Sequence, residues 1–248
     1  MENECQHLTC GFDTRIMNIF YTTQIDGNRA FLDENESNHA VRVLRMKAGE
    51  RAILVDGKGN RYEAVIEESH PKHCTFGIEN VAIDNPRPYR LSIAMAPTKN
   101  SERTEWFLEK AVEIGVDDFV PILSRHSERK NINMERLQKV ALAAMKQSMK
   151  ATLPKIAQII AFESLIEKPF DGKKLIAHCY SGAKPHIKEV VAPSENAIVL
   201  IGPEGDFSEE EIALAQKHGF QDISLGQSRL RTETAALTAC AALAFVNS

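Results

Sequence analysis

Two stretches near the carboxyl end decide the fold of this chain: Leu200-Ile-Gly-Pro-Glu-Gly-Asp-Phe-Ser208 and Ser224-Leu-Gly-Gln-Ser-Arg-Leu-Arg-Thr-Glu-Thr-Ala235. Each stretch leaves an apolar run, passes through a glycine turn and enters a predicted helix. The apolar run 197–201 is typical of a strand that is covered on both faces. Gly202 and Gly205 permit a close approach to the backbone that a side chain would obstruct. Because ligands bind at the carboxyl ends of parallel strands, both turns are candidates for one binding site.

The helices that follow the two turns have recognisable first residues. Ser208 and Glu211 form a Ser-x-x-Glu capping box, and Gly219 follows the last periodic residue, so we expect a helix over residues 208–218. Thr232 is the expected cap of an alanine-rich helix that runs toward the carboxyl end. The turns are therefore expected to present free backbone amides to a ligand.

The motifs narrow the class of site only in part. Neither turn matches the dinucleotide pattern G-x-G-x-x-G or the phosphate-loop pattern that ends in Gly-Lys-Ser/Thr. A phosphate anchor is therefore unsupported, and a single glycine turn is often purely structural. From the residues alone, a nucleotide-binding Rossmann-like enzyme and a non-catalytic RNA-binding protein both stay open as alternatives.

The composition is that of an ordinary globular chain. Of 248 residues, 43% are hydrophobic and 26% are charged, and a chain of this length can bury a sizeable core. The most apolar stretch, residues 234–246, is too short to span a bilayer, and we expect a core or dimer-interface helix there.

The cysteines and histidines favour a reducing compartment without a metal site. The five cysteines are odd in number, scattered and without a Cys-x-x-Cys pair, so we expect reduced thiols and a cytoplasmic location. His70, His73 and Cys74 lie close together, but no distant ligand group accompanies them. We therefore expect no metal.

Charge is unevenly distributed along the chain. The net charge is −4, but residues 39–51 carry four Lys/Arg and one Glu, and residues 125–155 carry eight Lys/Arg and two Glu. These segments contribute +3 and +6, so the remainder carries −13. Such segregation predicts a basic stripe that attracts phosphates. The alternative is a solvated basic face on the predicted helix 133–149.

The order of elements predicts two domains. Short strands are expected at residues 18–22, 30–32, 51–55 and 61–67, with a hairpin turn at 56–60 and one helix at 35–45. This pattern indicates a small β-barrel, and the proline-bearing segment 85–90 reads as a linker. Strands and helices then alternate, which indicates an α/β domain with a mostly parallel sheet. The expected elements are strands 91–96, 119–123 and 156–160 and helices 101–114 and 133–149, the former with Ser101 as cap and Gly115 as stop.

At the two stretches the sequence resembles a known family. Gly-Pro-Glu-Gly, then Leu-Gly, then Leu-Arg-Thr-Glu-Thr-Ala, at this spacing, resemble the RsmE family of 16S ribosomal RNA uridine-N3 methyltransferases, of the SPOUT superfamily. The resemblance continues through residues 98–116, 147–148 and 39–45, and it covers nearly everything from Met17 onward. The family usually has a second glycine where this chain has Asp206, and an isoleucine where it has Arg229.

The resemblance implies an architecture and a set of partners. It implies a SPOUT-type trefoil-knotted α/β domain at 91–248, a PUA-like RNA-binding β-barrel at 17–84, the linker 85–90 and an N-terminal extension at 1–16. It also implies S-adenosylmethionine as cofactor, a homodimer, and 16S ribosomal RNA of the small ribosomal subunit as partner.

The resemblance also assigns roles to particular residues. The cofactor residues would be His178, Leu200, Ile201, Gly202, Pro203, Glu204, Gly205, Ser224, Leu225, Gly226, Leu230, Arg231, Thr232, Glu233, Thr234 and Ala235. The expected RNA-binding residues are His39, Arg42, Arg45, Lys47, Lys99, Arg103, Gln147 and Lys150. Arg231 is the first catalytic candidate, because a guanidinium favours the anion that forms as uridine N3 loses its proton. Glu204 is the second, as a proton acceptor or a cofactor ligand, and Glu233 is the alternative for the same role.

Overall fold

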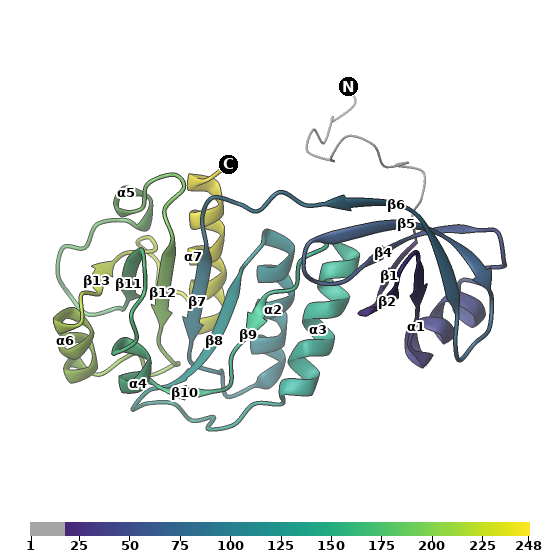
Figure 1. Cartoon of the computed structure of the whole chain (residues 1–248). Coiled ribbons are helices and arrows are strands. Elements are labelled where there is room, and N and C mark those ends of the chain that lie inside the picture. Colours follow the sequence, from purple (N-terminus) through teal and green to yellow (C-terminus); the bar gives the residue numbers. More distant parts are fainter. Residues whose placement is uncertain (1–17) are drawn as a thin grey trace. The chain divides into compact units, whose positions relative to one another are not determined.

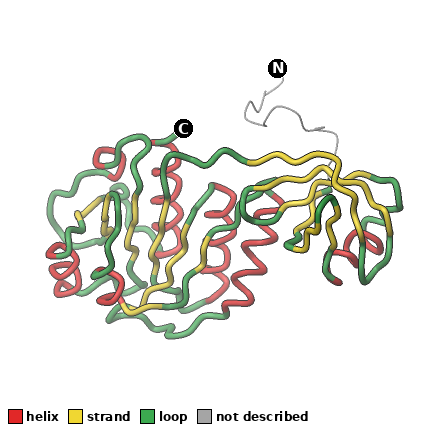
Figure 2. The backbone as a smooth tube through the Cα atoms, in the orientation of Figure 1, coloured by secondary structure: helices red, strands yellow, loops and turns green. Residues whose placement is uncertain are grey.

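The computed structural model describes residues 18–248, which form two compact units (Figures 1 and 2). The first unit contains the described residues up to Pro86 and the segment Met145–Leu153, and the second contains Arg87–Ala144 and Pro154–Ser248. The predicted extension, residues 1–16, lies outside the described residues. The predicted domain boundaries at residues 84 and 91 stay a prediction.

Within its described residues, the first unit is built on a six-stranded sheet in the order β1-β4-β5-β6-β3-β2. β1 pairs parallel with β4, and the other neighbours are antiparallel. Phe20, Leu54 and Phe76, from strands across this sheet, are fully buried in one apolar cluster. The strands are β1 (Ile19–Tyr21), β2 (Gln24–Asp26), β3 (Arg29–Phe31), β4 (Arg51–Val55), β5 (Asn60–Glu68) and β6 (Thr75–Ile83).

The predicted hairpin between β4 and β5 is confirmed, and its turn is organised by one carboxylate. The Asp56 carboxylate accepts hydrogen bonds from the backbone N–H groups of Lys58 at 2.8 Å and Asn60 at 3.2 Å. Gly57 and Gly59 have positive φ angles of 76° and 100°, which favour glycine.

The predicted helix over residues 35–45 is wrong as a single element. It divides into α1 (Glu34–Asn38), capped by the Asp33 side chain, and one π-helical turn, η1 (His39–Val43). Arg45 then takes a left-handed φ of 57°, which ends the helical path.

The segment Met145–Leu153, which begins in the last turn of α3 (Met134–Gln147), belongs to the first unit, whereas contiguous domains are predicted. The Lys146 ammonium pairs with the Glu36 carboxylate, which is nearly buried and would be costly to leave without a counter-charge. The Gly59 N–H also donates to the Ala151 carbonyl at 3.0 Å. These contacts join residues that are far apart in sequence, so no local sequence pattern predicts them.

Within its described residues, the second unit carries a parallel sheet in the order β10-β8-β7-β12-β11-β13, with β9 pairing β8. The strands are β7 (Leu91–Met95), β8 (Asp118–Leu123), β9 (Lys155–Ile156), β10 (Ile160–Ala161), β11 (Lys173–Ala177), β12 (Ala197–Ile201) and β13 (Gln221–Ile223). The predicted strand 156–160 is therefore two short strands, because the chain leaves the β8 ladder after Ala157 donates to Phe119. The implied knot stays a prediction, since strand order names neighbours and not the threading of the chain.

Helices cover both faces of this sheet (Figure 1). The helices are α2 (Ser101–Ile114), α3 (Met134–Gln147), α4 (Phe162–Ile166), α5 (Ile187–Val190), α6 (Glu209–Lys217) and α7 (Thr232–Val246). Ile122 of β8 lies in the apolar cluster formed with α4 and α6, whereas the Phe119 ring meets Phe107 of α2, with centroids 5.5 Å apart. The two β8 residues point to opposite faces because side chains alternate along a strand. No helix within residues 18–248 is long and apolar enough to cross a bilayer.

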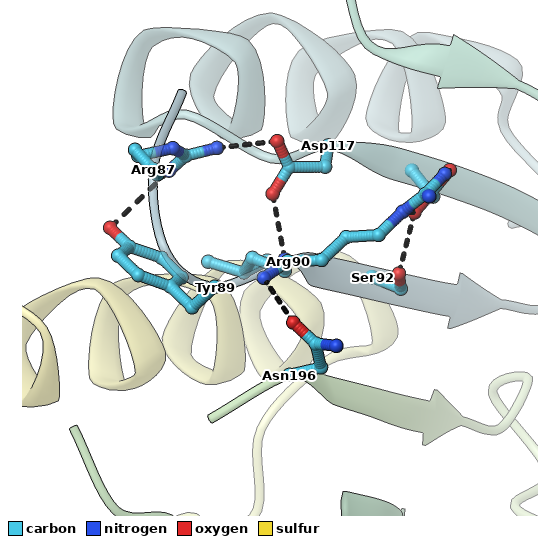
Figure 3. A network of polar contacts seen from close by, with 8 residues as sticks. Arg87, Tyr89, Arg90, Ser92, Asp117 and Asn196 are labelled. Atoms are coloured by element: carbon cyan, nitrogen blue, oxygen red, sulfur yellow. Dashed lines mark hydrogen bonds and ion pairs between the residues drawn. The ribbon is translucent and has the colours of Figure 1, made fainter. Parts of the chain in front are cut away.

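A polar network ties the start of β7 to its two neighbouring strands (Figure 3). Asp117 accepts from the Arg87 guanidinium at 2.6 Å and from the Leu91 N–H at 2.7 Å. On the other side, the Arg90 N–H donates to the Asn196 side chain at 2.8 Å. The network thus holds the amino ends of the central strands in register. The opposite, carboxyl ends of these strands are where ligands bind in parallel sheets.

At two helices the residue in the cap position differs from the predicted one. The side chain of Asn100, not Ser101, caps α2 by accepting from the Glu102 N–H at 3.0 Å, and Gly115 ends the helix at φ 115° as predicted. Thr232 is the first residue of α7, and Arg231 holds the cap position without a side-chain bond. The capping box of Ser208 and Glu211 on α6 is confirmed.

Replacement of the α2 cap should cost stability where replacement of its neighbour does not. Asn100→Ala removes the acceptor for an amide at the start of the helix, and we expect a loss of about 1 kcal/mol in the free energy of unfolding. Ser101→Ala, one residue inside the helix, should change it by less than about 0.5 kcal/mol. Denaturant unfolding of both variants measures the difference, and equal effects would contradict the assignment of the cap.

Candidate functional site

A cavity of about 710 Å³ opens at the carboxyl ends of β11, β12 and β13. Its size lies in the range of pockets that hold drug-sized ligands. Most of the predicted cofactor residues line it: His178, Ile201, Gly202, Pro203, Glu204, Ser224, Leu225, Gly226, Leu230, Arg231, Thr232 and Ala235. The two glycine turns therefore meet at one site, as the sequence predicts.

Four predicted residues do not line the cavity: Leu200, Gly205, Glu233 and Thr234. Leu200 is fully buried within β12, where its side chain serves the core. Other lining residues were not predicted as cofactor ligands: Arg103, Ala177, Cys179, Tyr180, Lys184, Asp206, Ile223, Gln227, Ser228 and Arg229. Cys179, Tyr180 and Lys184 belong to a loop whose only signal in the sequence is its position after the apolar run 175–177.

The Gly-Pro-Glu-Gly turn is tight at its first glycine. A Cβ atom at Gly202 would lie 3.0 Å from the Phe207 nitrogen, a contact that would force the neighbouring backbone to shift by a few tenths of an ångström. The Asp206 N–H donates to the Pro203 carbonyl at 2.9 Å and closes the turn. Glu204 is held by a residue outside the turn, because its carboxylate accepts the Lys99 N–H at 3.0 Å. The turn thus holds its backbone in place before any ligand binds.

The second turn is held by its own serine and by a neighbouring loop. Ser224 Oγ accepts from the Gly226 N–H at 3.2 Å, and the Ser224 N–H donates to the Pro185 carbonyl at 2.9 Å. Gly226 has a φ of 127°, a conformation that side chains rarely allow. The turn after β13 and the loop after β11 therefore form one connected wall.

His178 lies in this wall between the carboxylate of Asp222 and the ammonium of Lys184. Its Nε2 is 3.5 Å from the Asp222 carboxylate, and its Nδ1 is 3.3 Å from the Lys184 ammonium. Because an ammonium only donates, Nδ1 is the acceptor in the contact with Lys184. The Lys184 ammonium also donates to the carbonyls of His178 and Tyr180, at 2.7 Å each. Lys184 thus shapes the loop that carries His178.

Arg231 is exposed in the cavity wall, and its side chain makes no hydrogen bond or ion pair with any residue in 18–248. The acid two residues later does not engage it. Glu233 is nearly buried, its Oε1 lies 3.8 Å from the Nε of Arg103, and its Oε2 has no partner among the described residues. The arrangement leaves a guanidinium available to a ligand at the cavity.

The predicted RNA-binding residues separate into two groups. His39, Arg42, Arg45 and Lys47 lie exposed around η1, and the last three form no ion pair within the described residues. One face of the His39 ring meets Phe20, with centroids 6.1 Å apart. Lys99 pairs with Glu128 at 2.8 Å and Arg103 faces Glu233, while Gln147 and Lys150 lie in the segment that packs with the first unit.

Several cations of the basic run 125–155 pair with acids. Arg125, Arg136 and Lys146 pair with Glu210, Glu105 and Glu36, and Lys139 pairs with Glu135. Arg129 donates to the carbonyls of Thr98 and Lys99. The local excess of +6 in sequence is therefore reduced in space by acids from other elements. Within residues 18–248, no group of three or more metal-ligating side chains gathers.

Comparisons with known proteins agree on one family. A family model described as an RNA methyltransferase domain matches residues 85–244, and one described as an RNA methyltransferase PUA domain matches residues 32–79. Ribosomal RNA small subunit methyltransferase E of Mesomycoplasma hyopneumoniae is 36% identical over 166 residues, which are 64% of this chain and 71% of that protein. The protein of that name in Aquifex aeolicus is 28% identical over 227 residues, or 90% of this chain and 96% of its own.

Solved structures give the same answer. A probable rRNA-methyltransferase from Porphyromonas gingivalis superposes with a TM-score of 0.86 at 42% identity, over 93% of this chain and 98% of that one. Ribosomal RNA small subunit methyltransferase E from Neisseria gonorrhoeae, bound to S-adenosyl methionine, superposes with a TM-score of 0.84 at 28% identity, over 93% and 98% of the two chains. The chain therefore belongs to the RNA methyltransferase family that includes ribosomal RNA small subunit methyltransferase E, the family that its two terminal motifs resemble.

Proposed function

We propose that this protein transfers a methyl group from S-adenosylmethionine to N3 of a specific uridine in 16S ribosomal RNA of the small ribosomal subunit, in the cytoplasm. The observation that carries the proposal is the unpartnered Arg231 guanidinium in the cavity wall. Family membership supports the reaction class, the cofactor-bound relative supports the donor, and the motif resemblance supports uridine N3.

The cavity fits the donor in size and in the chemistry of its walls. Residues of the turns 202–206 and 224–230 line it, and backbone amide and carbonyl groups of such turns can bind an adenine and a ribose. Glu204 lines the cavity together with the cationic Arg229, which suits a ligand with charges of both signs. When bound, S-adenosylmethionine supplies an electrophilic methyl group.

The protein's part in the reaction is to prepare the nucleophile. Uridine N3 carries a proton and lies on the pairing edge, so the base must be unpaired before it reaches the cavity. Arg231 stabilises the anion that forms as N3 loses this proton, because a positive charge in a partly closed site acts at low dielectric. Glu204 is the candidate for receiving the proton, because it lines the cavity and its carboxylate is already oriented by the Lys99 N–H.

RNA is gripped by the first unit. Arg42, Arg45 and Lys47 present three cations around η1 that no described acid neutralises. Phosphate contacts by such residues position RNA without reading its sequence. The match of residues 32–79 to a PUA domain supports this role.

A homodimer is the third element of the proposal. Phe245 near the end of α7 is 78% exposed, which is unusual for a large aromatic side chain unless another chain covers it. The rest of α7 buries its other faces against α2, β7 and β12. Residues 234–246 thus serve the core on one side and offer an apolar contact on the other.

Loss of the cavity guanidinium should lower catalysis more than donor binding. Arg231→Ala is expected to reduce kcat on small-subunit particles by about 100-fold, with the Kd for S-adenosylmethionine within about threefold. Arg231→Lys keeps the charge and should recover part of the rate. Radiolabel transfer and calorimetry measure the two quantities, and nucleoside mass mapping identifies the product. Full activity of Arg231→Ala, or stabilisation by ATP or NAD but not by the methyl donor, would refute the proposal.

Charge reversal around η1 should weaken RNA binding and its salt dependence. Arg42→Glu combined with Arg45→Glu removes two phosphate contacts, so the slope of log K against log salt should fall by about 1.5. Arg29→Glu with Arg51→Glu is the matched control, because it changes net charge equally at residues that already pair with Glu67 and Glu79. Titration of 16S RNA at several salt concentrations decides, and equal effects of the two pairs would exclude the η1 surface.

A charge at the exposed end of α7 should separate the subunits. We expect the wild-type protein to sediment at twice the mass of the chain and Phe245→Asp to sediment as a monomer at micromolar concentration, since a carboxylate in an apolar contact is costly. Phe245→Leu keeps an apolar side chain and should remain dimeric. A monomeric wild-type protein in sedimentation equilibrium would contradict this part of the proposal.

A further inference from the structure

Asp206 occupies a conformation that normally selects glycine. It has a φ of 64°, and it is one of four non-glycine residues with positive φ within residues 18–248. A side chain in this region is strained, although aspartate tolerates it better than most residues. The chain therefore accepts strain here that a simpler residue would avoid.

The carboxylate of Asp206 joins two separate loops. Its Oδ2 accepts the backbone N–H of Cys179 at 2.7 Å, and its Oδ1 accepts the N–H of Phe207 at 2.8 Å. Hydrogen bonds to an ionised acceptor are about twice as strong as neutral ones. The main chain of Asp206 adds a further link, because its carbonyl lies 3.0 Å from Nδ1 of His126 in the loop after β8.

The bond to Cys179 falls where the sheet no longer holds the chain. The ladder between β11 and β12 ends at the pair Ala177 and Ile201, two residues before Cys179. The other polar bonds of this loop are internal or reach β13: Lys184 donates to the carbonyls of His178 and Tyr180, and Pro185 pairs with Ser224. Asp206 thus supplies the side-chain link between the loop after β11 and the loop after β12.

Both linked loops form walls of the cavity. Cys179 and Tyr180 line one side, and the turn from Gly202 to Asp206 lines the adjoining side. A wall that is held in place before binding loses less conformational freedom when the ligand arrives, and this raises affinity without adding a contact.

We propose that Asp206 is a positioning residue. Its carboxylate links the loop after β11 to the loop after β12 and so fixes the cofactor cavity before S-adenosylmethionine binds, at the cost of local backbone strain. The inference rests on the proposed placement of the cofactor in this cavity. It deepens that placement, because a residue without a reacting role becomes a determinant of affinity.

In the variant Asp206→Gly we expect the affinity for S-adenosylmethionine to fall without a loss of thermal stability. Asp206→Gly relieves the positive φ and removes the carboxylate, so the Tm should stay equal or rise while the Kd for S-adenosylmethionine increases roughly tenfold. Asp206→Asn is the matched control. Asparagine tolerates the same φ and its side-chain oxygen can accept the Cys179 N–H, so the Kd should stay within about threefold of wild type.

Cys179 offers a local reporter that does not depend on activity. It is exposed, whereas Cys74 and Cys240 are buried and serve as internal references. Burial raises the pKa of the Cys179 thiol, and the neighbouring Asp206 carboxylate raises it further. Loss of that carboxylate lowers the pKa and increases the thiolate fraction, so iodoacetamide should label Cys179 several-fold faster in Asp206→Gly. Peptide mass mapping of the full chain gives the rate at each cysteine.

The outcomes separate this inference from the proposed function. Tenfold weaker donor binding by Asp206→Gly, unchanged or higher Tm, faster labelling of Cys179 and near-normal binding by Asp206→Asn support it. Wild-type affinity of Asp206→Gly overturns it alone. A loss of several degrees in the Tm of Asp206→Gly, or an equal loss of affinity in Asp206→Asn, also overturns it, by assigning the effect to folding or to charge. A wild-type protein that does not bind the donor overturns the proposed function and this inference with it.

Discussion

The parallel direction of β7, β8, β11, β12 and β13 is the constraint on which the site depends. Because these strands point the same way, the five loops that follow them meet at one edge of the sheet. Segments that are far apart along the chain, such as the loops at 178–186 and 224–231, therefore form one cavity. The polar network at the amino ends of the same strands, from Arg87 to Asn196, keeps their register (Figure 3).

Carboxylates just after β12 then connect the loops to one another. Glu204 accepts the N–H of Lys99 after β7, Asp206 accepts that of Cys179 after β11, and Glu211 accepts that of Arg125 after β8 at 2.7 Å. Each bond uses a side chain to satisfy a backbone amide that lies beyond the reach of the strand ladders. The segment 202–211 thus connects to the loops after β7, β8 and β11.

The tertiary structure, and not the order of residues in the sequence, decides which charged side chains are paired with opposite charges. The run 125–155 is strongly basic in sequence, but several of its side chains pair with acids of α1, α2 and α6 or bond to carbonyls of the loop after β7. The smaller group of Arg42, Arg45 and Lys47 keeps its charges free of described acids. Arg231 likewise keeps a free guanidinium, because the acid two residues later faces Arg103. Exposed charge without a partner, more than the number of charges, marks the surfaces that can meet RNA.

Several features could be predicted because they depend on neighbours in sequence. The capping box of Ser208, the αL stop at Gly115, the hairpin at 56–60 and the alternation of strands and helices are local, and the structure confirms them. The single helix at 35–45 failed because a left-handed Arg45 and a π-helical turn replaced its last turns, and the strand 156–160 failed because two short pairings with β8 replaced one. Neither replacement has a composition signal.

The sequence by itself determined the α/β class, the two glycine turns and the family, since each of these is written in short patterns of residue type and spacing. Only the tertiary structure decided which side chains close the cavity, which charges are neutralised and why an aspartate stands at residue 206. These properties arise from contacts between residues distant in the chain, such as Asp206 with Cys179 and Lys146 with Glu36. Such contacts form only after the sheet has set its strand order, and no window of sequence contains both partners.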